Sequence, residues 1–151
     1  MAISAAMVKE LRERTGLGMM DCKKALAEAG GDMDQAIEDL RKKSSLKAAK
    51  KAGRTAANGL LGVKSSDDGT RIALVEVNIE TDFAAKNEKF VAFVSRVAQT
   101  LFDSGDMDSV TQTLNAERET LVQEIGENMA IRRGAIVESA SGGLSYYMHG
   151  D

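Results

Sequence analysis

The sequence contains only one cysteine, Cys22, and only one histidine, His149. A single cysteine excludes a disulfide within the chain and is typical of proteins from a reducing cytoplasm. These two residues form no Cys/His cluster, so we expect neither a bound metal nor another cofactor. Any site that combines a nucleophile, a histidine and an acid would have to include His149.

Signals for membrane insertion and export are also missing. No apolar run approaches the roughly 20 residues that a membrane-spanning helix requires. The first residues, MAISAAMVKELRER, lack the basic start and the apolar core of a secretory signal. We therefore expect a cytoplasmic protein.

Length and charge indicate two modules. The 151 residues suffice for one ordinary domain, or for a small domain and one of about a hundred residues. Residues 1–54 carry 12 Lys and Arg against 8 Asp and Glu, a sum of +4, while the whole chain has a net charge of −3. We expect a three-helix domain with a basic connector over residues 1–54, and the first half of an α+β core domain over 55–151.

The first module has the pattern of three short helices. Ser4 is suited to cap the first helix and Gly16 to end it, while Gly30 is suited to end the second. Asp32 is suited to cap the third, with Gln35 completing a capping box. The apolar positions at helical spacing are Met7, Val8, Leu11, Cys22, Leu26, Ala29, Ile37 and Leu40. The Lys- and Ala-rich residues 41–59 predict a helical connector that is prone to fraying.

The second module begins with a two-residue period. Residues 60–66 and 70–80 flank Asp-Asp-Gly, which predicts an antiparallel hairpin. One face of its second strand is apolar, with Ala73, Val75, Val77 and Ile79. On the other face Ile72 and Leu74 give way to Glu76 and Asn78, so we expect that face to become wet toward Thr81.

Two helices and a further hairpin follow. Helical spacing starts at Asn87, and a second helix covers roughly residues 110–125. The apolar stripe of the first of these helices is Phe90, Phe93, Val94, Val97 and Leu101. Residues 128–139 and 144–150 alternate around Ala-Ser-Gly-Gly, which predicts another hairpin. The order β-β-α-α-β-β predicts an α+β fold with helices on one face of a small antiparallel sheet.

An acid and an aromatic residue stand together at the junction of strand and helix, in NIETDFAAKNEKF. Thr81 or Asp82 is suited to cap the helix that follows. Phe83 precedes the regular apolar stripe, and two interpretations stay open for it. It either plugs the corner between strand and helix, or serves as a rigid anchor for a crevice in a partner protein.

Several motifs resemble the elongation factor Ts family, in the same order. MVKELRERTGLGMMDCKKAL is similar to the family's LVKELRERTG and GMMDCKKAL, and EVNIETDFAAKNEKF is similar to its EVNxxTDFVA(K/R) signature. IGENMAIRR and YYMHG follow, like the family's IGENxxIRR and YxHG. The resemblance covers essentially the whole chain. Because family chains are about twice as long, this one looks like an N-terminal half that stops where the second core half begins.

The resemblance implies a nucleotide exchange factor for elongation factor Tu, which is not an enzyme. It implies that Asp82 and Phe83 contact the GTP-binding domain of that partner. The ring would wedge between two helices and loosen Mg²⁺ and the phosphate-binding loop, so that GDP leaves. Thr81 and Ala84 complete the motif, although Ala84 stands where the signature often has Val.

Further contact residues follow from the same resemblance. Ile125 and Gly126 would support the wedge, and His149 would lie near the same crevice. Met19 and Met20 would pack on a helix of the partner, a role that suits long and polarizable side chains. We expect no direct contact with nucleic acid or membrane.

Three other interpretations stay open. The first module is similar to a ubiquitin-associated domain, which favours a protein-binding adaptor, or a docking fragment without exchange activity. The basic residues between Arg41 and Arg54 favour nucleic-acid binding, but no aromatic residue for base stacking occurs in 1–54. Cys22 with His149 would favour an enzyme, but Cys22 falls on an apolar helix face, as buried structural thiols do.

Overall fold

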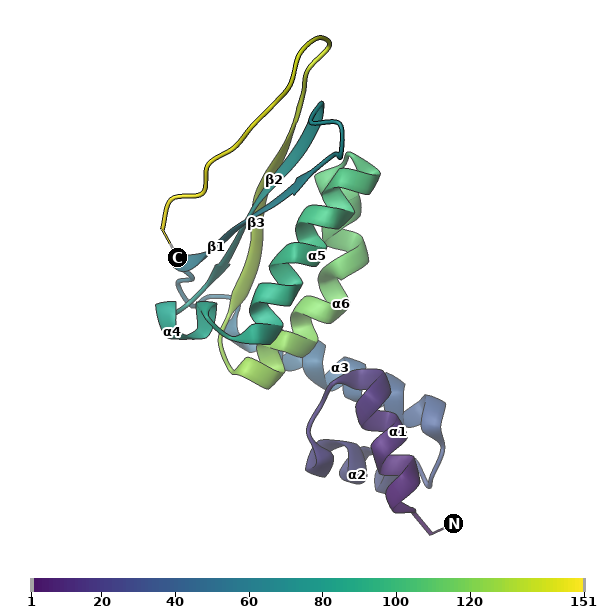
Figure 1. Ribbon diagram of the computed structural model, residues 1–151. Helices are drawn as coiled ribbons and strands as arrows, with labels where there is room; N and C mark the ends of the chain where they lie inside the picture. The colour runs from purple at the N-terminus through teal and green to yellow at the C-terminus, as the bar shows by residue number, and fades with distance from the viewer. Residues whose placement is uncertain (1, 151) are drawn as a thin grey trace. The chain divides into compact units, whose positions relative to one another are not determined.

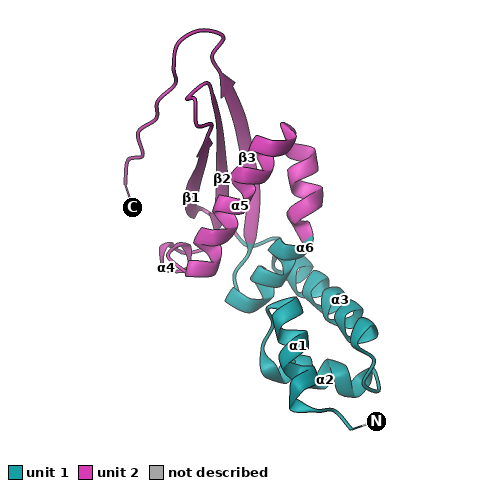
Figure 2. Cartoon of the chain, turned by 45° about the vertical axis from the view of Figure 1, so that its right-hand side comes forward, with its two compact units in different colours: residues 1–54, 116–128 teal, residues 55–115, 129–151 magenta. Residues whose placement is uncertain are grey.

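The computed structural model describes residues 2–150 (Figure 1). The chain divides into two compact units. Unit 1 comprises the chain up to Arg54 together with Ala116–Asn128, and unit 2 comprises Thr55–Asn115 together with the chain from Met129 onward (Figure 2). Helix α6 (Met107–Ile125) contributes residues to both units. The sequence did not predict that the end of α6 packs with the N-terminal helices.

Unit 1 begins with α1 (Ala5–Thr15), α2 (Met19–Glu28) and α3 (Met33–Lys51). Ser4 caps α1 as predicted, because its side chain accepts a hydrogen bond from the Met7 N–H. Gly16 ends α1 in the left-handed region, at a φ of 73°, which favours glycine. The core of these three helices is formed by Leu11, Leu17, Cys22, Ala25, Leu26, Ala36 and Leu40.

Helix α3 is longer than the predicted third helix, because it also includes most of the predicted connector. The Asp32 carboxylate caps it by accepting from the Gln35 N–H. The predicted capping box is wrong, because the Gln35 side chain donates to Asp39 and the Asp32 N–H donates to the Ala29 carbonyl. The connector is helical as far as Lys51 and forms one continuous helix with the third predicted one.

Unit 2 contains a three-stranded antiparallel sheet in the order β1-β2-β3. Strands β1 (Asn58–Ser65) and β2 (Arg71–Ile79) form the predicted hairpin, and β3 (Met129–Glu138) pairs with the other edge of β2. Val75 in the central strand pairs with Gly62 on one side and with Gly134 on the other. The apolar face that the sequence predicted for β2 is fully buried.

Two helices cover that face. A short turn, α4 (Asp82–Ala85), leads into α5 (Glu88–Ser104), which lies across the strands, followed by the first part of α6 (Figure 1). All five residues of the predicted stripe of α5 are buried. A Cβ atom on Gly62 would come within 3.0 Å of the Val94 carbonyl oxygen, and one on Gly134 within 2.6 Å of the Met107 sulfur. The absence of side chains at these two positions therefore lets the helices approach the sheet.

Two local predictions in unit 2 are wrong. Residues 144–150 form no strand but run back along the sheet without regular structure (Figure 1). Alternation yields a strand only where a partner edge supplies a hydrogen-bond ladder, and here the Leu144 N–H donates to Gly69 in the β1–β2 turn. Asn78 is buried instead of wet, because its side-chain amide donates to the Asn58 carbonyl, whereas Leu74 on the same face is exposed.

The predicted α+β class is confirmed: three N-terminal helices precede a small antiparallel sheet packed against helices. Among the described residues, no helix is both long enough and apolar enough to span a membrane.

Candidate protein-binding site

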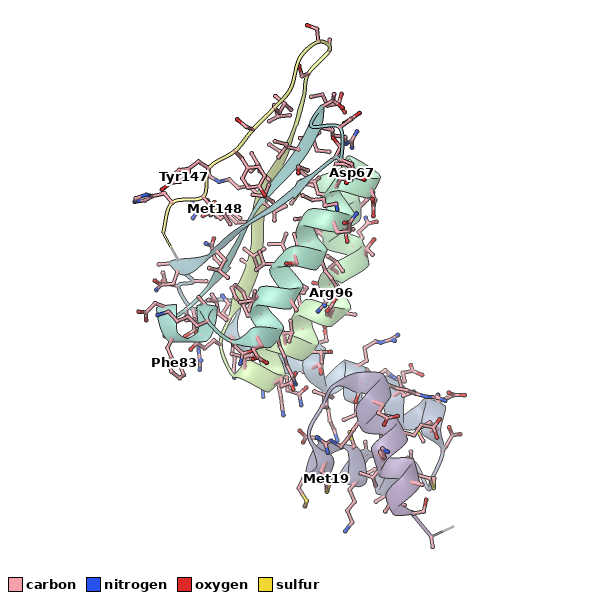
Figure 3. All side chains as sticks on the ribbon, viewed as in Figure 1. Met19, Asp67, Phe83, Arg96, Tyr147 and Met148 are labelled. Carbon is pink, nitrogen blue, oxygen red and sulfur yellow. The ribbon has the colours of Figure 1, made fainter. Side chains whose placement is uncertain are left out.

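The turn that follows β2 presents Phe83 to solvent. The Thr81 hydroxyl caps α4 by accepting from the Ala84 N–H at 3.1 Å. Ala84 and Ala85 are buried and hold the inner side of the turn against unit 2. Phe83 then lies on the outer side, where 87% of its surface is exposed (Figure 3). The interpretation of Phe83 as a plug for the corner is therefore wrong.

Asp82 stands beside the exposed ring. Its carboxylate accepts a hydrogen bond from the Phe83 N–H at 2.9 Å, so the acid and the aromatic residue share one hydrogen-bonded turn. Thr81, and not Asp82, is the residue that caps the helix. Next to Asp82 an open groove of about 610 Å³ is lined by Asn58, Gly59, Leu60, Asp82, Ala85, Lys86 and Val91.

His149 also belongs to unit 2 but lies on the C-terminal segment. It is exposed, and its ring centroid is 6.3 Å from that of Tyr147. Tyr147 and Met148 lie on the same segment and are both exposed (Figure 3). Exposed apolar side chains of this kind are suited to contact a protein partner. The sequence marked only His149 in this group, although two adjacent tyrosines in a chain with six aromatic residues were a signal for the others.

Met19 and Met20 form an exposed pair in unit 1. They occupy the first turn of α2, and 57% and 75% of their respective surfaces are exposed. Further along the helix, Cys22, Ala25 and Leu26 are buried in the core. Figure 3 shows Met19 at the end of the helix, pointing outward.

A groove of about 560 Å³ adjoins this pair. It is lined by Ile3, Ser4, Ala5, Val8, Lys9, Arg12, Met19 and Lys23. Three of these residues are cations and most of the others are apolar, which suits an amphipathic segment that carries acids. Sequence reasoning did not single out these cations, although Lys9 and Arg12 are spaced to share one helix face.

Ile125 and Gly126 lie in the same unit as the methionine pair. Ile125 is the last residue of α6 and is half-buried. Gly126 has a φ of 86° and donates its N–H to the Val122 carbonyl at 2.9 Å, which ends the helix in a left-handed turn. The expected contact residues thus fall into two sets, one in unit 1 with Met19 and Met20, the other in unit 2 with Phe83.

The structure gives no support to an enzyme site at Cys22. The thiol is completely buried, 3.7 Å from the Thr15 hydroxyl, and burial raises its pKa. A buried thiol with a raised pKa forms little thiolate and is a poor nucleophile. Within residues 2–150, no group of His, Cys, Asp and Glu is arranged to hold a metal ion.

The basic stripe of α3 is partly neutralised within its own unit. Lys42 lies 3.1 Å from Glu38, and Lys43 lies 3.0 Å from Glu28. Both pairs are solvent-exposed and contribute little to stability, but they reduce the field that a polyanion would meet. This arrangement favours an ordinary solvated helix face.

Comparisons with known proteins agree with the motifs. The family model described as elongation factor TS matches residues 80–151. This range includes Phe83, Gly126 and His149. Elongation factor Ts of Teredinibacter turnerae is 55% identical over 152 residues, which cover 99% of this chain and 52% of that protein. The protein of the same name from Hahella chejuensis is 55% identical, and the match covers 99% of this chain and 53% of that protein. The one from Marinobacter nauticus is 58% identical, and the match covers 91% of this chain and 48% of that protein. The chain therefore spans about half the length of the curated relatives it matches.

Proposed function

Because the chain belongs to the elongation factor Ts family, we propose that it binds elongation factor Tu and promotes the release of GDP from it. The observation that carries this proposal is the exposed ring of Phe83, which stands next to the Asp82 carboxylate in a capped turn. Large rigid aromatic side chains are the preferred anchors of protein interfaces. A buried Phe83 would have removed the main support for the proposal.

In this proposal the ring acts as a wedge. Phe83 enters a crevice between helices of the GTP-binding domain, and Asp82 contacts the same surface. The insertion loosens Mg²⁺ and the phosphate-binding loop of the partner. Because the ion bridges phosphate oxygens and offsets their charge, its loss weakens nucleotide binding. We assign a supporting role to Ile125 and Gly126, and a place near the same crevice to His149.

The proposed action requires no covalent chemistry and no cofactor of its own. A protein that binds nucleotide-free elongation factor Tu more tightly than the GDP-bound form must weaken GDP binding by the same factor. About 1.4 kcal/mol of this coupling corresponds to a tenfold change in affinity. Rebinding of GTP then releases the exchange factor unchanged.

A second contact is proposed for the N-terminal helices. Met19 and Met20 pack on a helix of elongation factor Tu, because both side chains are exposed, long and adaptable. In this view residues 1–54 form a docking domain and residues 55–151 form part of the core domain that displaces the nucleotide. We place this activity in the cytoplasm.

The test is the release of a fluorescent GDP analogue from elongation factor Tu, chased with unlabelled GDP and titrated with this chain. We expect the release rate to rise with chain concentration, although less than with a full-length relative, because the relatives have further sequence for contacts. Binding without faster release would support the second candidate, a docking fragment that uses the exposed methionine pair. Absence of any binding would overturn both.

A further inference from the structure

Polar side chains are rarely buried in this protein, and those that are concentrate at one junction. Among the described residues, the buried polar side chains are Ser44, Asn78 and Asn128. Asn78 lies in the sheet. Ser44 and Asn128 instead form hydrogen bonds that join α3 and the residues just after it to the end of α6 and the turn that follows. These last two residues belong to unit 1, in which residues 116–128 pack with the N-terminal helices (Figure 2).

The hydrogen bonds at this junction are specific. The Ser44 hydroxyl donates to the side-chain oxygen of Gln123, which lies two residues before the end of α6. The Asn128 amide donates to the Arg54 carbonyl at 2.8 Å and, more weakly, to the Ala52 carbonyl at 3.5 Å. Ala52 is the C-terminal cap of α3, so Asn128 satisfies acceptors that the helix end leaves open. We call Ser44, Gln123 and Asn128 the polar clamp.

The polar clamp brackets the turn that contains Ile125 and Gly126. Apolar side chains would fill the same space, but they would tolerate small shifts of one element against the other. A hydrogen bond tolerates them less, because it is directional and a displaced donor or acceptor loses its partner, and the side chains of Ser44 and Asn128 are themselves buried. The turn is open beside Gly126, where an added Cβ atom would have no neighbour within 4 Å, and the backbone there is left-handed.

We propose that Ser44 and Asn128 are positioning residues, which hold the turn at Ile125 and Gly126 fixed relative to Met19 and Met20. The two parts of the unit 1 surface then dock on elongation factor Tu as one rigid body, and binding of one part places the other. Preorganisation of this kind raises affinity, because the surface is already ordered and binding does not have to offset the entropy cost of ordering it. The inference rests on the proposed function.

A double-mutant cycle tests the coupling. Affinity for nucleotide-free elongation factor Tu is measured for the wild-type chain, Asn128→Ala, the double variant Met19→Ala/Met20→Ala, and the three changes combined. We expect the methionine changes to weaken binding about tenfold in the wild-type background, and by less than about threefold with Asn128→Ala. A similar loss in both backgrounds would show that Asn128 acts only on stability, and would overturn the inference.

Asn78→Ala provides the matched control, because it also removes a buried amide but lies in the sheet. The methionine changes should keep their full tenfold effect in that background, even if Asn78→Ala lowers the melting temperature as much as Asn128→Ala does. Should Asn128→Ala fail to fold, Ser44→Ala replaces it, since alanine is well suited to the middle of a helix. An equally small methionine effect in the Asn78→Ala background would overturn the inference, because any loss of stability would then suffice.

A second measurement needs no partner. Hydrogen exchange in the free chain reports the bond from the Gly126 N–H to Val122, and the equivalent bond from the Gly105 N–H to Leu101 at the end of α5 serves as the reference. Asn128→Ala should speed exchange at Gly126 by about tenfold and leave Gly105 unchanged. Unchanged protection at Gly126 would overturn the inference whether or not the chain binds. A wild-type chain that does not bind elongation factor Tu would instead refute the proposed function, and the docking role of the clamp with it.

Discussion

Replacing Phe83 by alanine separates a role in binding from a role in folding. A fully buried phenylalanine removes about 150–250 Å² from water, but 87% of this residue is exposed. Only about 26 Å² is therefore covered, which at about 25 cal/mol per Å² corresponds to roughly 0.7 kcal/mol. For a chain of this length we expect Phe83→Ala to lower the melting temperature by only about 1–3 °C.

The expected effect on binding is larger. Truncation of an aromatic anchor at the centre of an interface typically costs about 2 kcal/mol or more, which corresponds to roughly a 30-fold loss of affinity. Stopped-flow release of a fluorescent GDP analogue from elongation factor Tu should therefore lose most of its acceleration with Phe83→Ala. Leu46→Ala is the matched control, because it truncates another exposed apolar side chain and should keep full activity.

Phe93→Ala supplies the opposite case. That ring is completely buried in α5, so its truncation should cost about 3–5 kcal/mol of stability. If Phe83→Ala destabilised the chain to a similar extent, the ring would be part of the core, contrary to its position here. If the variant kept both its stability and its full exchange activity, Phe83 would not be the wedge.

Three further outcomes are expected. Gly62→Ala should lower the free energy of unfolding by about 1–3 kcal/mol, because the added methyl group would press on the backbone of α5 at Val94; thermal melts that match the wild type would contradict this. The pKa of Asp68 lies below its ordinary value of 3.8, chiefly because the Thr70 hydroxyl donates a hydrogen bond to the carboxylate. The ionised carboxylate therefore stabilises the fold above pH 3.8, and this contribution is lost as the pH falls through the lowered pKa. Urea unfolding should accordingly show a gap between wild type and Asp68→Ala that narrows below about pH 4, and a gap independent of pH would refute the assignment. Cys22, buried and with a raised pKa, should react with a thiol reagent only as fast as unit 1 opens, and rapid labelling under native conditions would contradict its burial.

Local sequence signals predicted most elements correctly. Ser4 and Asp32 start helices because a short oxygen-bearing side chain satisfies backbone donors a few residues away, and that chemistry is complete within one turn. The apolar stripe of α5 was equally predictable from the sequence, since the helical spacing of its apolar residues determines which face is buried. The motif with Phe83 was also visible in the sequence, but its two interpretations could not be separated there.

Tertiary contacts decided the rest. Whether Phe83 is covered depends on what packs around the turn, and only the structure shows the two alanines facing inward and the ring outward. The alternation in residues 144–150 suggested a strand that did not form, because a strand requires a partner edge that the alternating pattern does not encode. Ser44 and Asn128 had no signal at all, since their hydrogen-bond partners lie 74 or more residues away in the chain. The sequence by itself determined the helices, the hairpin and the family motifs, because those depend on neighbours along the chain. The exposure of the anchor and the polar clamp arose only when distant segments packed together.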